Sequence, residues 1–453
     1  MSPGSQENTG TGTEKPNIIV FFTDEQRWDT VGAYGCPLDI TPNADRLAAG
    51  GTLFRYAMTS APLCAPARSS ILTGKYPTKT GVVRNGLTLA DDEVTIAHML
   101  RRRGYEVGYV GKWHLGGTET KPVPLERRGG FDQWWEAADL LEYTSMPYDV
   151  TLFDADNRPI KLKNYRVDAL TDRAVEFLRQ KRSKPFFLFL SYLEPHHQNS
   201  PDGSFPDTFM APKGYAERFR NNFYIPRDLW PYPGDWKSQL PDYYGIVARL
   251  DECLGRIMKE LKDLGVEKNT ILVFTTDHGC HFRTRNAEYK RSCHESSIRI
   301  PFIIGGPGFE GGCVVENLVS TVDLVPTLLD CAGVQPPASV QGKSVLPLIQ
   351  GKRAGWRKHL LTQISESELG RGLRTGRWKY CVYDPTADPN TVHSTRYKER
   401  YFYDLHSDPH EHVNLVGRDD FREVADDLRK ALADQMVEIG EPLPAIEPAR
   451  FYA

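Results

Sequence analysis

Four short apolar segments of this chain each lead into residues that can bind a metal ion or transfer a proton. Carboxylates suit hard divalent cations, imidazoles transfer protons near neutral pH, and lysine ammonium groups hold anions. The segments and the residues after them are Ile18–Phe22 with Asp24 and Glu25, Val107–Val110 with Lys112 and His114, Phe186–Leu190 with His196 and His197, and Ile271–Phe274 with Asp277 and His278. Together these residues would supply a metal site, bound cations for an anion, and acid–base groups.

The segments themselves indicate how these residues are positioned. Continuous apolar runs bounded by polar residues or glycine are typical of strands buried on both faces of a mainly parallel sheet. In such sheets, ligands bind beyond the carboxyl ends of the strands. The four sets of residues are therefore predicted to meet in one site, and the chain is predicted to be an enzyme.

A fifth segment, Cys64-Ala65-Pro66-Ala67-Arg68, supplies a nucleophile and a further cation. Pro66 suits the first turn of a helix, where its missing N–H costs nothing, and the helix is expected to end at Gly74. Cys64 would then lie at a helix N-terminus, where free N–H groups and the dipole favour an anion. Arg68, about one helical turn later, can point its guanidinium group at the same place.

The same five residues fit the Cys-x-Pro-x-Arg signature of the type I sulfatases, and the chain resembles that family from about Lys15 to Leu415. Other segments occur in the order that the sulfatases use, and this makes the resemblance far more specific than one motif. They are Asn17–Asp24, Thr41–Ala48, Leu72–Pro77, Gly111–His114, Thr276–Gly279, Ile298–Pro301 and Tyr403–Leu405.

The resemblance implies an alkaline phosphatase-like α/β fold, with a mainly parallel central sheet between helices. It also implies a smaller C-terminal subdomain with an antiparallel sheet and a packed helix. Strand-like and helical segments alternate up to about Gly351 and the pattern then changes, so we expect a catalytic domain over 15–355 and the subdomain over 356–453. Residues 1–14 are polar and lack the apolar core of a signal peptide, which predicts a disordered leader.

Hydrophobic periodicity predicts individual helices and strands, and its absence predicts two long loops over the strand ends. The loops are expected where aromatic residues and proline cluster without clean periodicity, over 121–164 and 198–241. Helices are predicted over 42–49, 95–103, 167–181, 242–264, 323–332 and 421–439, and strands over 373–383 and 399–405.

Sulfate esters resist hydrolysis because their charged oxygens repel nucleophiles, so a catalyst needs a metal, cations and a strong nucleophile. A plain thiol serves poorly. The resemblance implies that a formylglycine-generating enzyme oxidises Cys64 to formylglycine, an aldehyde that hydrates to a geminal diol. In that mechanism one hydroxyl attacks sulfur, and the other later loses its proton so that sulfate is expelled.

The resemblance places the metal ligands at Asp24, Glu25, Cys64 (as formylglycine), Asp277 and His278. Hard carboxylate oxygens favour Ca²⁺, with Mg²⁺ or Mn²⁺ as alternatives. Glu25 departs from the aspartate common at its position, so it either coordinates from further away or only supports Asp24. His278 stands where many members have asparagine, and its softer nitrogen makes Mn²⁺ more plausible.

The resemblance also assigns catalytic roles. Arg68, Lys112 and Lys290 would hold sulfate oxygens, and His114 would take the diol proton. His196, with Lys290, would protonate or contact the leaving oxygen; whether His196 or His197 fills this position is open, and His197 could instead contact substrate or only pack. Asn85 is either a substrate ligand or a turn residue.

Composition bounds the partners and the compartment. The 453 residues carry a net charge of −3, so no nucleic-acid or other polyanion partner is implied. No apolar stretch approaches a membrane span. The eight cysteines include no CxxC pair. We therefore expect a cytoplasmic enzyme, unless a processed export signal preceded this sequence.

The resemblance leaves three functions open. Hydrolysis of a sulfate monoester, carbohydrate or aryl, is favoured. A phosphonate monoester or phosphodiester hydrolase of the same superfamily is the alternative, although those enzymes generally have Tyr-x-Thr where this chain has Lys112 and His114. A non-catalytic protein that binds sulfated glycans would be expected to have lost Cys64 or a metal carboxylate, and this chain keeps both.

Overall fold

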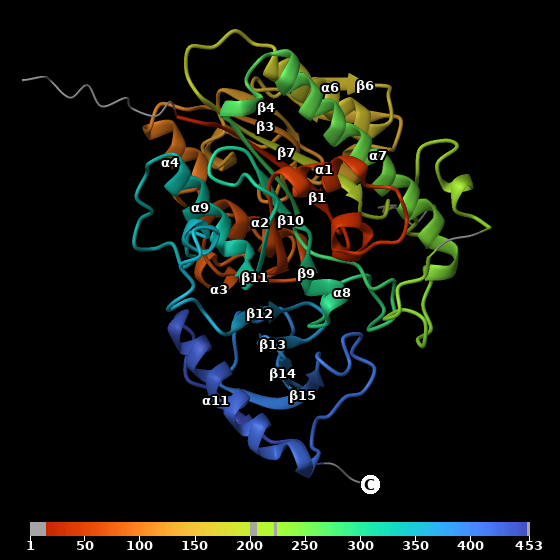
Figure 1. Ribbon diagram of the computed structural model, residues 1–453, viewed down its shortest axis with the longest axis vertical. Helices are drawn as coiled ribbons and strands as arrows, with labels where there is room; N and C mark the ends of the chain where they lie inside the picture. The colour runs from red at the N-terminus through yellow and green to blue at the C-terminus, as the bar shows by residue number, and fades with distance from the viewer. Residues whose placement is uncertain (1–14, 200–205, 222–223, 451–453) are drawn as a thin grey trace, which may run out of the picture.

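The computed structural model describes residues 15–199, 206–221 and 224–450, so the predicted leader lies outside the described residues. A large α/β body carries a smaller sheet with its own helix at one end (Figure 1). The strands of the large sheet are β1 (Asn17–Asp24), β2 (Thr52–Met58), β3 (Glu106–Lys112), β4 (Trp134–Ala138), β5 (Val150–Phe153), β6 (Pro159–Leu162), β7 (Phe186–Pro195), β8 (Thr270–Thr276), β9 (Arg299–Ile300), β10 (Phe302–Gly305) and β11 (Cys313–Ser320). The α/β fold class is confirmed.

The centre of this sheet is parallel, and its margins are mixed. The strand order is β11-β2-β10-β8-β1-β7-β3-β4-β5-β6, with β9 paired to β2 outside this path. β1 runs parallel to both β7 and β8, and β3 runs parallel to β7 and β4. β10 and the β4-β5-β6 margin pair antiparallel. The four predicted strands before the functional residues are therefore neighbours that end at one edge.

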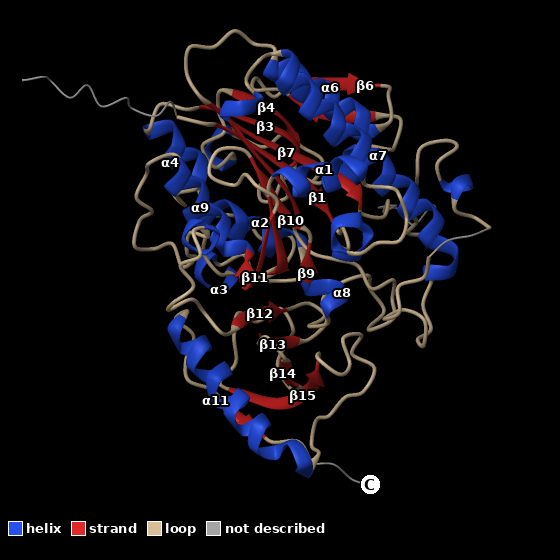
Figure 2. Ribbon diagram, in the orientation of Figure 1, coloured by secondary structure: helices blue, strands red, loops and turns tan. Residues whose placement is uncertain are grey.

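Helices cover both faces of the large sheet (Figure 2). β1 shows why: Ile19 and Phe21 pack into one core, and Ile18, Val20 and Phe22 pack into the other. All five side chains are fully buried, as expected for a strand between two helical layers. The helices of the body are α1 (Pro42–Gly50), α2 (Cys64–Thr73), α3 (Pro77–Thr80), α4 (Ile96–Arg102), α5 (Leu141–Thr144), α6 (Arg166–Leu178), α7 (Trp236–Asp263), α8 (Glu295–Ile298), α9 (Leu324–Cys331) and α10 (Leu346–Ile349).

The smaller sheet is antiparallel except at its last strand. β12 (Leu360–Ile364), β13 (Leu369–Arg374), β14 (Trp378–Asp384) and β15 (Arg396–Asp404) form a meander, and β16 (Ala445–Glu447) adds parallel to β15. The helix α11 (Arg422–Glu438) covers this sheet with an apolar stripe at helical spacing. The stripe is Ala425, Leu428, Leu432 and Met436.

Three predicted segments differ from the structure. Residues 121–164 were expected to be a loop but contain β4, α5, β5 and β6, whose short strands carry too few residues for a clear period. The predicted strand 373–383 is two strands that turn at Gly376. α7 begins at Trp236, ahead of the predicted 242, because Pro241 lies in its second turn and removes only one backbone bond. Among the described residues, no helix is both long and apolar enough to cross a bilayer.

A buried ion pair fastens the chain after α11 to the smaller sheet. Arg371 on β13 places its Nε 3.0 Å from both oxygens of Glu441, and each side chain is about 1% exposed. Glu441→Ala should destabilise the protein by about 3–5 kcal/mol, because it leaves a buried guanidinium group without its counter-charge.

Urea unfolding of Glu441→Ala and of Glu447→Ala would test this. Glu447 pairs with Lys398 at 3.2 Å on the surface, and an exposed pair contributes less than about 1 kcal/mol. Equal losses of stability in the two variants would contradict the assignment.

Candidate active site

The strand ends bring the predicted residues together. Asp24 is the last residue of β1 and Lys112 the last of β3, while His196 and Asp277 directly follow β7 and β8. Asp24 is in register with Pro195, and Thr23 with Thr276. Because these strands are parallel, all four side chains lie at the same edge of the sheet, as the sequence predicted.

Cys64 lies at the centre of this group. It is the first residue of α2, which ends at Gly74 in the left-handed conformation, and every residue of the helix is buried. Its Sγ is 3.6 Å from Asp24 Oδ1, 3.3 Å from His278 Nε2 and 3.3 Å from Lys290 Nζ. The predicted nucleophile therefore touches a carboxylate, an imidazole and an ammonium group at once.

One cluster at this position can hold a divalent cation. Ligand atoms of Asp24, Cys64, Asp277 and His278 all lie within 4.8 Å of one another, and the four residues are buried. Asp277 Oδ2 is buried and accepts no hydrogen bond from the described residues, although Arg68 Nε lies 3.6 Å away. Two carboxylates and an imidazole in a closed space suit a hard divalent cation, and a cation would give this oxygen a direct partner.

The carboxylate of Glu25 belongs to a second cluster. Its Oε2 is 3.4 Å from His196 Nε2, 3.4 Å from His197 Nδ1 and 3.2 Å from Lys290 Nζ. Among the described residues, the hydrogen bond from Glu25 to the first cluster comes from its backbone N–H, which donates to Asp277 Oδ1 at 3.0 Å. Of the two roles predicted for Glu25, this placement favours support over direct coordination.

Two more cations point at Asp24. Arg68 Nη2 lies 2.8 Å and Lys112 Nζ 2.9 Å from Asp24 Oδ2. Arg68 Nη1 also donates to the carbonyl of Lys112 at 2.9 Å and to Ser191 Oγ at 2.8 Å. These bonds fix the guanidinium group and the end of β3 relative to each other.

The charged groups in the site shift one another's pKa values. Burial alone would raise the pKa of Asp24, but Lys112 and the other surrounding cations lower that pKa well below its usual value. Burial, reinforced by Asp24, raises the pKa of Cys64 to about 12. The unmodified thiol is therefore protonated at neutral pH and is a weak nucleophile, since the thiolate is the reactive form.

His114 and His196 are held neutral. Burial and then the charge of Lys112 lower the pKa of His114 well below its usual value, and burial and then Lys290 do the same for His196. His196 Nε2 lies 2.7 Å from Lys290 Nζ, and Nδ1 of His114 has no hydrogen-bond partner among the described residues. A neutral imidazole can accept a proton, so both are suited to proton transfer.

The two residues predicted at the substrate have structural contacts as well. Asn85 Oδ1 accepts a hydrogen bond of 3.1 Å from the N–H of Ala65, at the start of α2. His197 stacks on His196 with a centroid distance of 4.2 Å, and its Nε2 lies 3.2 Å from Asn199 Nδ2. Their roles toward substrate stay predictions.

Sequence reasoning did not find Glu142, which lies 3.1 Å from Lys112 Nζ. It lies on α5, within the segment that was expected to be a loop. Recognising β4 could have revealed it. Glu142 follows β4 in the sequence, and β4, as a parallel neighbour of β3, must also end at the catalytic edge.

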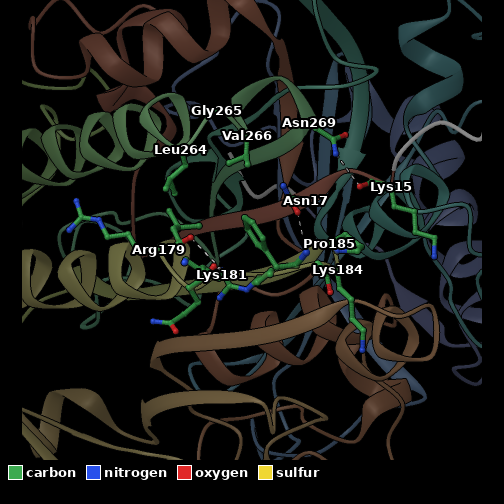
Figure 3. Close-up of a pocket in the computed structure, with 15 residues that line it drawn as sticks. Lys15, Asn17, Arg179, Lys181, Lys184, Pro185, Leu264, Gly265, Val266 and Asn269 are labelled. Atoms are coloured by element: carbon green, nitrogen blue, oxygen red, sulfur yellow. Dashed lines mark hydrogen bonds between the residues drawn. The ribbon is translucent and has the colours of Figure 1, made fainter.

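A separate cavity lies at the opposite edge of the sheet, where β1 and β7 begin (Figure 3). Its volume is about 720 Å³, and Asn17, Pro185 and basic residues such as Lys181 and Lys184 line it. Because β1 and β7 are parallel, this cavity is remote from their carboxyl ends and is not part of the candidate active site.

Comparison with known proteins gives the family. A family model described as Sulfatase matches residues 16–334, and a second, described as N-sulphoglucosamine sulphohydrolase, C-terminal, matches residues 287–438. The chain belongs to the sulfatase family. The resemblance in the sequence is thereby confirmed, and this sulfatase is a sulfuric ester hydrolase.

Individual relatives agree. This sulfatase is 31% identical to an ulvan-active sulfatase of Formosa agariphila, over 94% of this chain and 82% of the relative. It is 30% identical to human arylsulfatase A, over 89% of this chain and 83% of the relative. It is also 28% identical to an N-acetylglucosamine-6-O-sulfatase of Bacteroides thetaiotaomicron, over 93% and 86% of the two chains.

Solved structures share the fold. One, determined with its substrate D-glucosamine-2-N,6-O-disulfate, matches with a TM-score of 0.80 and 25% identity, over 94% of this chain and 98% of that one. The phosphonate monoester hydrolase of Agrobacterium radiobacter matches with a TM-score of 0.68 and 22% identity, over 94% and 96% of the two chains. This second likeness concerns the fold alone.

Proposed function

We propose that this sulfatase hydrolyses a sulfate monoester of a carbohydrate to an alcohol and inorganic sulfate, with formylglycine derived from Cys64 as its nucleophile. The observation that carries the proposal is the position of Cys64 Sγ, between Asp24, His278 and Lys290. Aryl sulfates would serve as simple test substrates.

The carbohydrate half of the proposal comes from the relatives. Their names specify ulvan and N-acetylglucosamine 6-sulfate as targets, and one structural neighbour was solved with a glucosamine disulfate. A sulfated saccharide is therefore the substrate class that we favour.

The sulfatase family implies a divalent metal, and the residues of this chain fit one. Asp24, Asp277 and His278 would hold it together with the modified Cys64. The carboxylate oxygens suit Ca²⁺, Mg²⁺ or Mn²⁺ better than zinc, and Ca²⁺ is our first choice. When bound, the metal would lower the pKa of the nucleophile and neutralise sulfate oxygens. A formylglycine-generating enzyme would be the maturation partner.

The other side chains would act on the ester itself. Lys112, Arg68 and Lys290 would bind the non-bridging oxygens, where charge develops in the transition state. His196 and Lys290, hydrogen-bonded to each other, would together protonate the leaving oxygen, with the proton supplied by the Lys290 ammonium group. His114, whose Nδ1 is unpaired, would accept the proton that releases sulfate.

The sulfatase proposal and the phosphonate monoester or phosphodiester alternative differ in which activity should fall more when Lys112 or His114 is replaced. Loss of one transition-state contact typically costs about 10²–10³-fold in rate, so Lys112→Ala and His114→Ala should each reduce sulfate-ester kcat/KM by that factor. Any phosphodiester activity should fall less, because enzymes with Tyr-x-Thr at this turn hydrolyse diesters without the lysine.

A panel of aryl sulfates, sugar sulfates and aryl phosphate diesters, with the wild type and both variants, would test the proposal. The wild type should prefer sulfate. The diesterase proposal would replace the sulfatase one if the wild type prefers the diester and if the variants lose as much diester kcat/KM as sulfate-ester kcat/KM, or more. Binding of sulfated sugar without any turnover by fully modified enzyme would favour a glycan-binding protein.

A further inference from the structure

The residue after Lys290 has an unusual backbone conformation. Arg291 has φ of 67°, in the left-handed region that residues other than glycine seldom adopt. Its N–H donates to the carbonyl of Pro62 at 3.1 Å, and its carbonyl accepts from Ser367 Oγ at 2.6 Å. Such a conformation costs of the order of 1 kcal/mol or more and persists only where surrounding contacts enforce it. Here those contacts come from the segment before Cys64 and from the smaller sheet.

Glu366 makes the charged part of this junction. It lies in the turn between β12 and β13 and also has a left-handed backbone, with φ of 64°. Its Oε2 pairs with Arg291 Nη2 at 2.7 Å, and its Oε1 accepts from the N–H of Asn85 at 2.7 Å. Asn85 in turn accepts from the N–H of Ala65, so this one carboxylate connects the loop of Lys290 to the start of α2.

The catalytic-domain side of the Lys290 loop is fixed separately. His281 Nε2 lies 3.0 Å and Asn286 Nδ2 2.9 Å from the carbonyl of Lys290. Glu366 approaches from the other side, out of the smaller sheet. The Lys290 loop is thus held between the large α/β body and the smaller sheet, and Glu366 is a charged contact from the smaller sheet.

We propose that Glu366 is a positioning residue that sets the distance between Cys64 and Lys290. It acts through Arg291 and Asn85 and touches no reacting atom. The inference rests on the proposed function of Cys64 and Lys290, whose Sγ and Nζ are 3.3 Å apart. A misplacement of about 1 Å between reacting groups can cost about 10²-fold in rate, so a contact that fixes this distance should affect kcat more than KM.

Glu368 provides a matched control in the same turn. The side chain of Glu366 is 17% exposed and that of Glu368 20%, and each pairs with an arginine. Glu368, however, pairs with Arg400 of β15 at 3.5 Å, and among the described residues its side chain makes no hydrogen bond or ion pair to the catalytic loops. Removing either carboxylate should disturb the turn similarly, so only a positioning role separates their effects.

The experiment compares Glu366→Ala, Glu366→Gln and Glu368→Ala in aryl sulfate kinetics, with kcat normalised to the modified fraction of Cys64. Glu366→Ala should lower kcat by about 10–100-fold with little change in KM. Glu368→Ala should match the wild type, and thermal unfolding midpoints of the two alanine variants should agree. Glu366→Gln should retain part of kcat, because its amide oxygen can still accept a hydrogen bond from the N–H of Asn85. If the alanine variant fails to fold, Glu366→Gln takes its place in the comparison with Glu368→Ala.

Arg291→Met tests whether Glu366 acts on Lys290 through Arg291. Residues that act through one another are not additive, so Glu366→Ala combined with Arg291→Met should be no slower than the slower single variant. Losses that multiply, or a Glu366→Ala enzyme as active as Glu368→Ala, would overturn the positioning role. A wild type that turns over no sulfate ester would instead contradict the proposed function itself.

Discussion

Cys64→Ala is expected to remove sulfatase turnover while leaving the protein folded. The thiol of Cys64 is buried and its pKa is raised to about 12 by burial and by Asp24, so the unmodified residue is a poor nucleophile at neutral pH. Only the proposed oxidation supplies two hydroxyls on one carbon, and alanine offers no atom to oxidise. Removal of a catalytic nucleophile can cost about 10⁶-fold in kcat.

Mass spectrometry of the Cys64 peptide, together with kinetics on the same preparations, checks this directly. Turnover should rise in proportion to the fraction of aldehyde. Cys253→Ala is the control, because it removes an equally buried thiol from α7 and should keep wild-type turnover. Full activity in a sample with no modified Cys64 would refute the formylglycine mechanism.

Asp24→Ala and Asp277→Ala are each expected to remove both bound metal and activity. The first cluster offers only two carboxylates beside His278 and Cys64, so losing one leaves too few hard ligands for Ca²⁺. Asp24 also neutralises Arg68 and Lys112, and its loss should therefore destabilise the fold as well. Asp277→Ala leaves the pairs of Asp24 with Arg68 and Lys112 in place, so comparing the unfolding midpoints of the two variants separates the effects.

Glu25→Ala is the matched comparison for the metal. Its carboxylate lies with His196, His197 and Lys290, so most of the metal should remain while turnover falls. Elemental analysis of the purified variants measures the difference. Undiminished metal in both aspartate variants, or complete loss in Glu25→Ala, would contradict the division into two clusters.

The catalytic edge could be predicted because Asp24, Lys112 and Asp277 lie at the end of a buried strand or directly after it. Their placement needs no knowledge of distant contacts beyond the rule that parallel strands end together. Glu366 is different. Its partners Asn85 and Arg291 lie 281 and 75 positions away, beside the large sheet, and no local pattern marks a carboxylate that will meet them.

The ambiguous residues show the same limit. Asn85 was open between a substrate ligand and a turn residue, and its hydrogen bonds to Ala65 and Glu366 appear only once three separate loops are assembled. Glu25 differs from aspartate by one methylene, and the sequence left open whether it coordinates or supports. In the structure the carboxylate of Glu25 lies beside His196 and His197, and therefore belongs to the second cluster.

The pairing of β1 with β8 has a consequence for the timing of maturation. Ile18 pairs with Ile271, across most of the catalytic domain, and parallel pairing of distant segments is slow because the long loop must first close. Until then the segment around Cys64 has no sheet to bury it, whereas in the folded protein every residue of α2 is inaccessible. A modifying enzyme would thus find its target only on the nascent or unfolded chain, and a variant that folds faster would leave less time for oxidation.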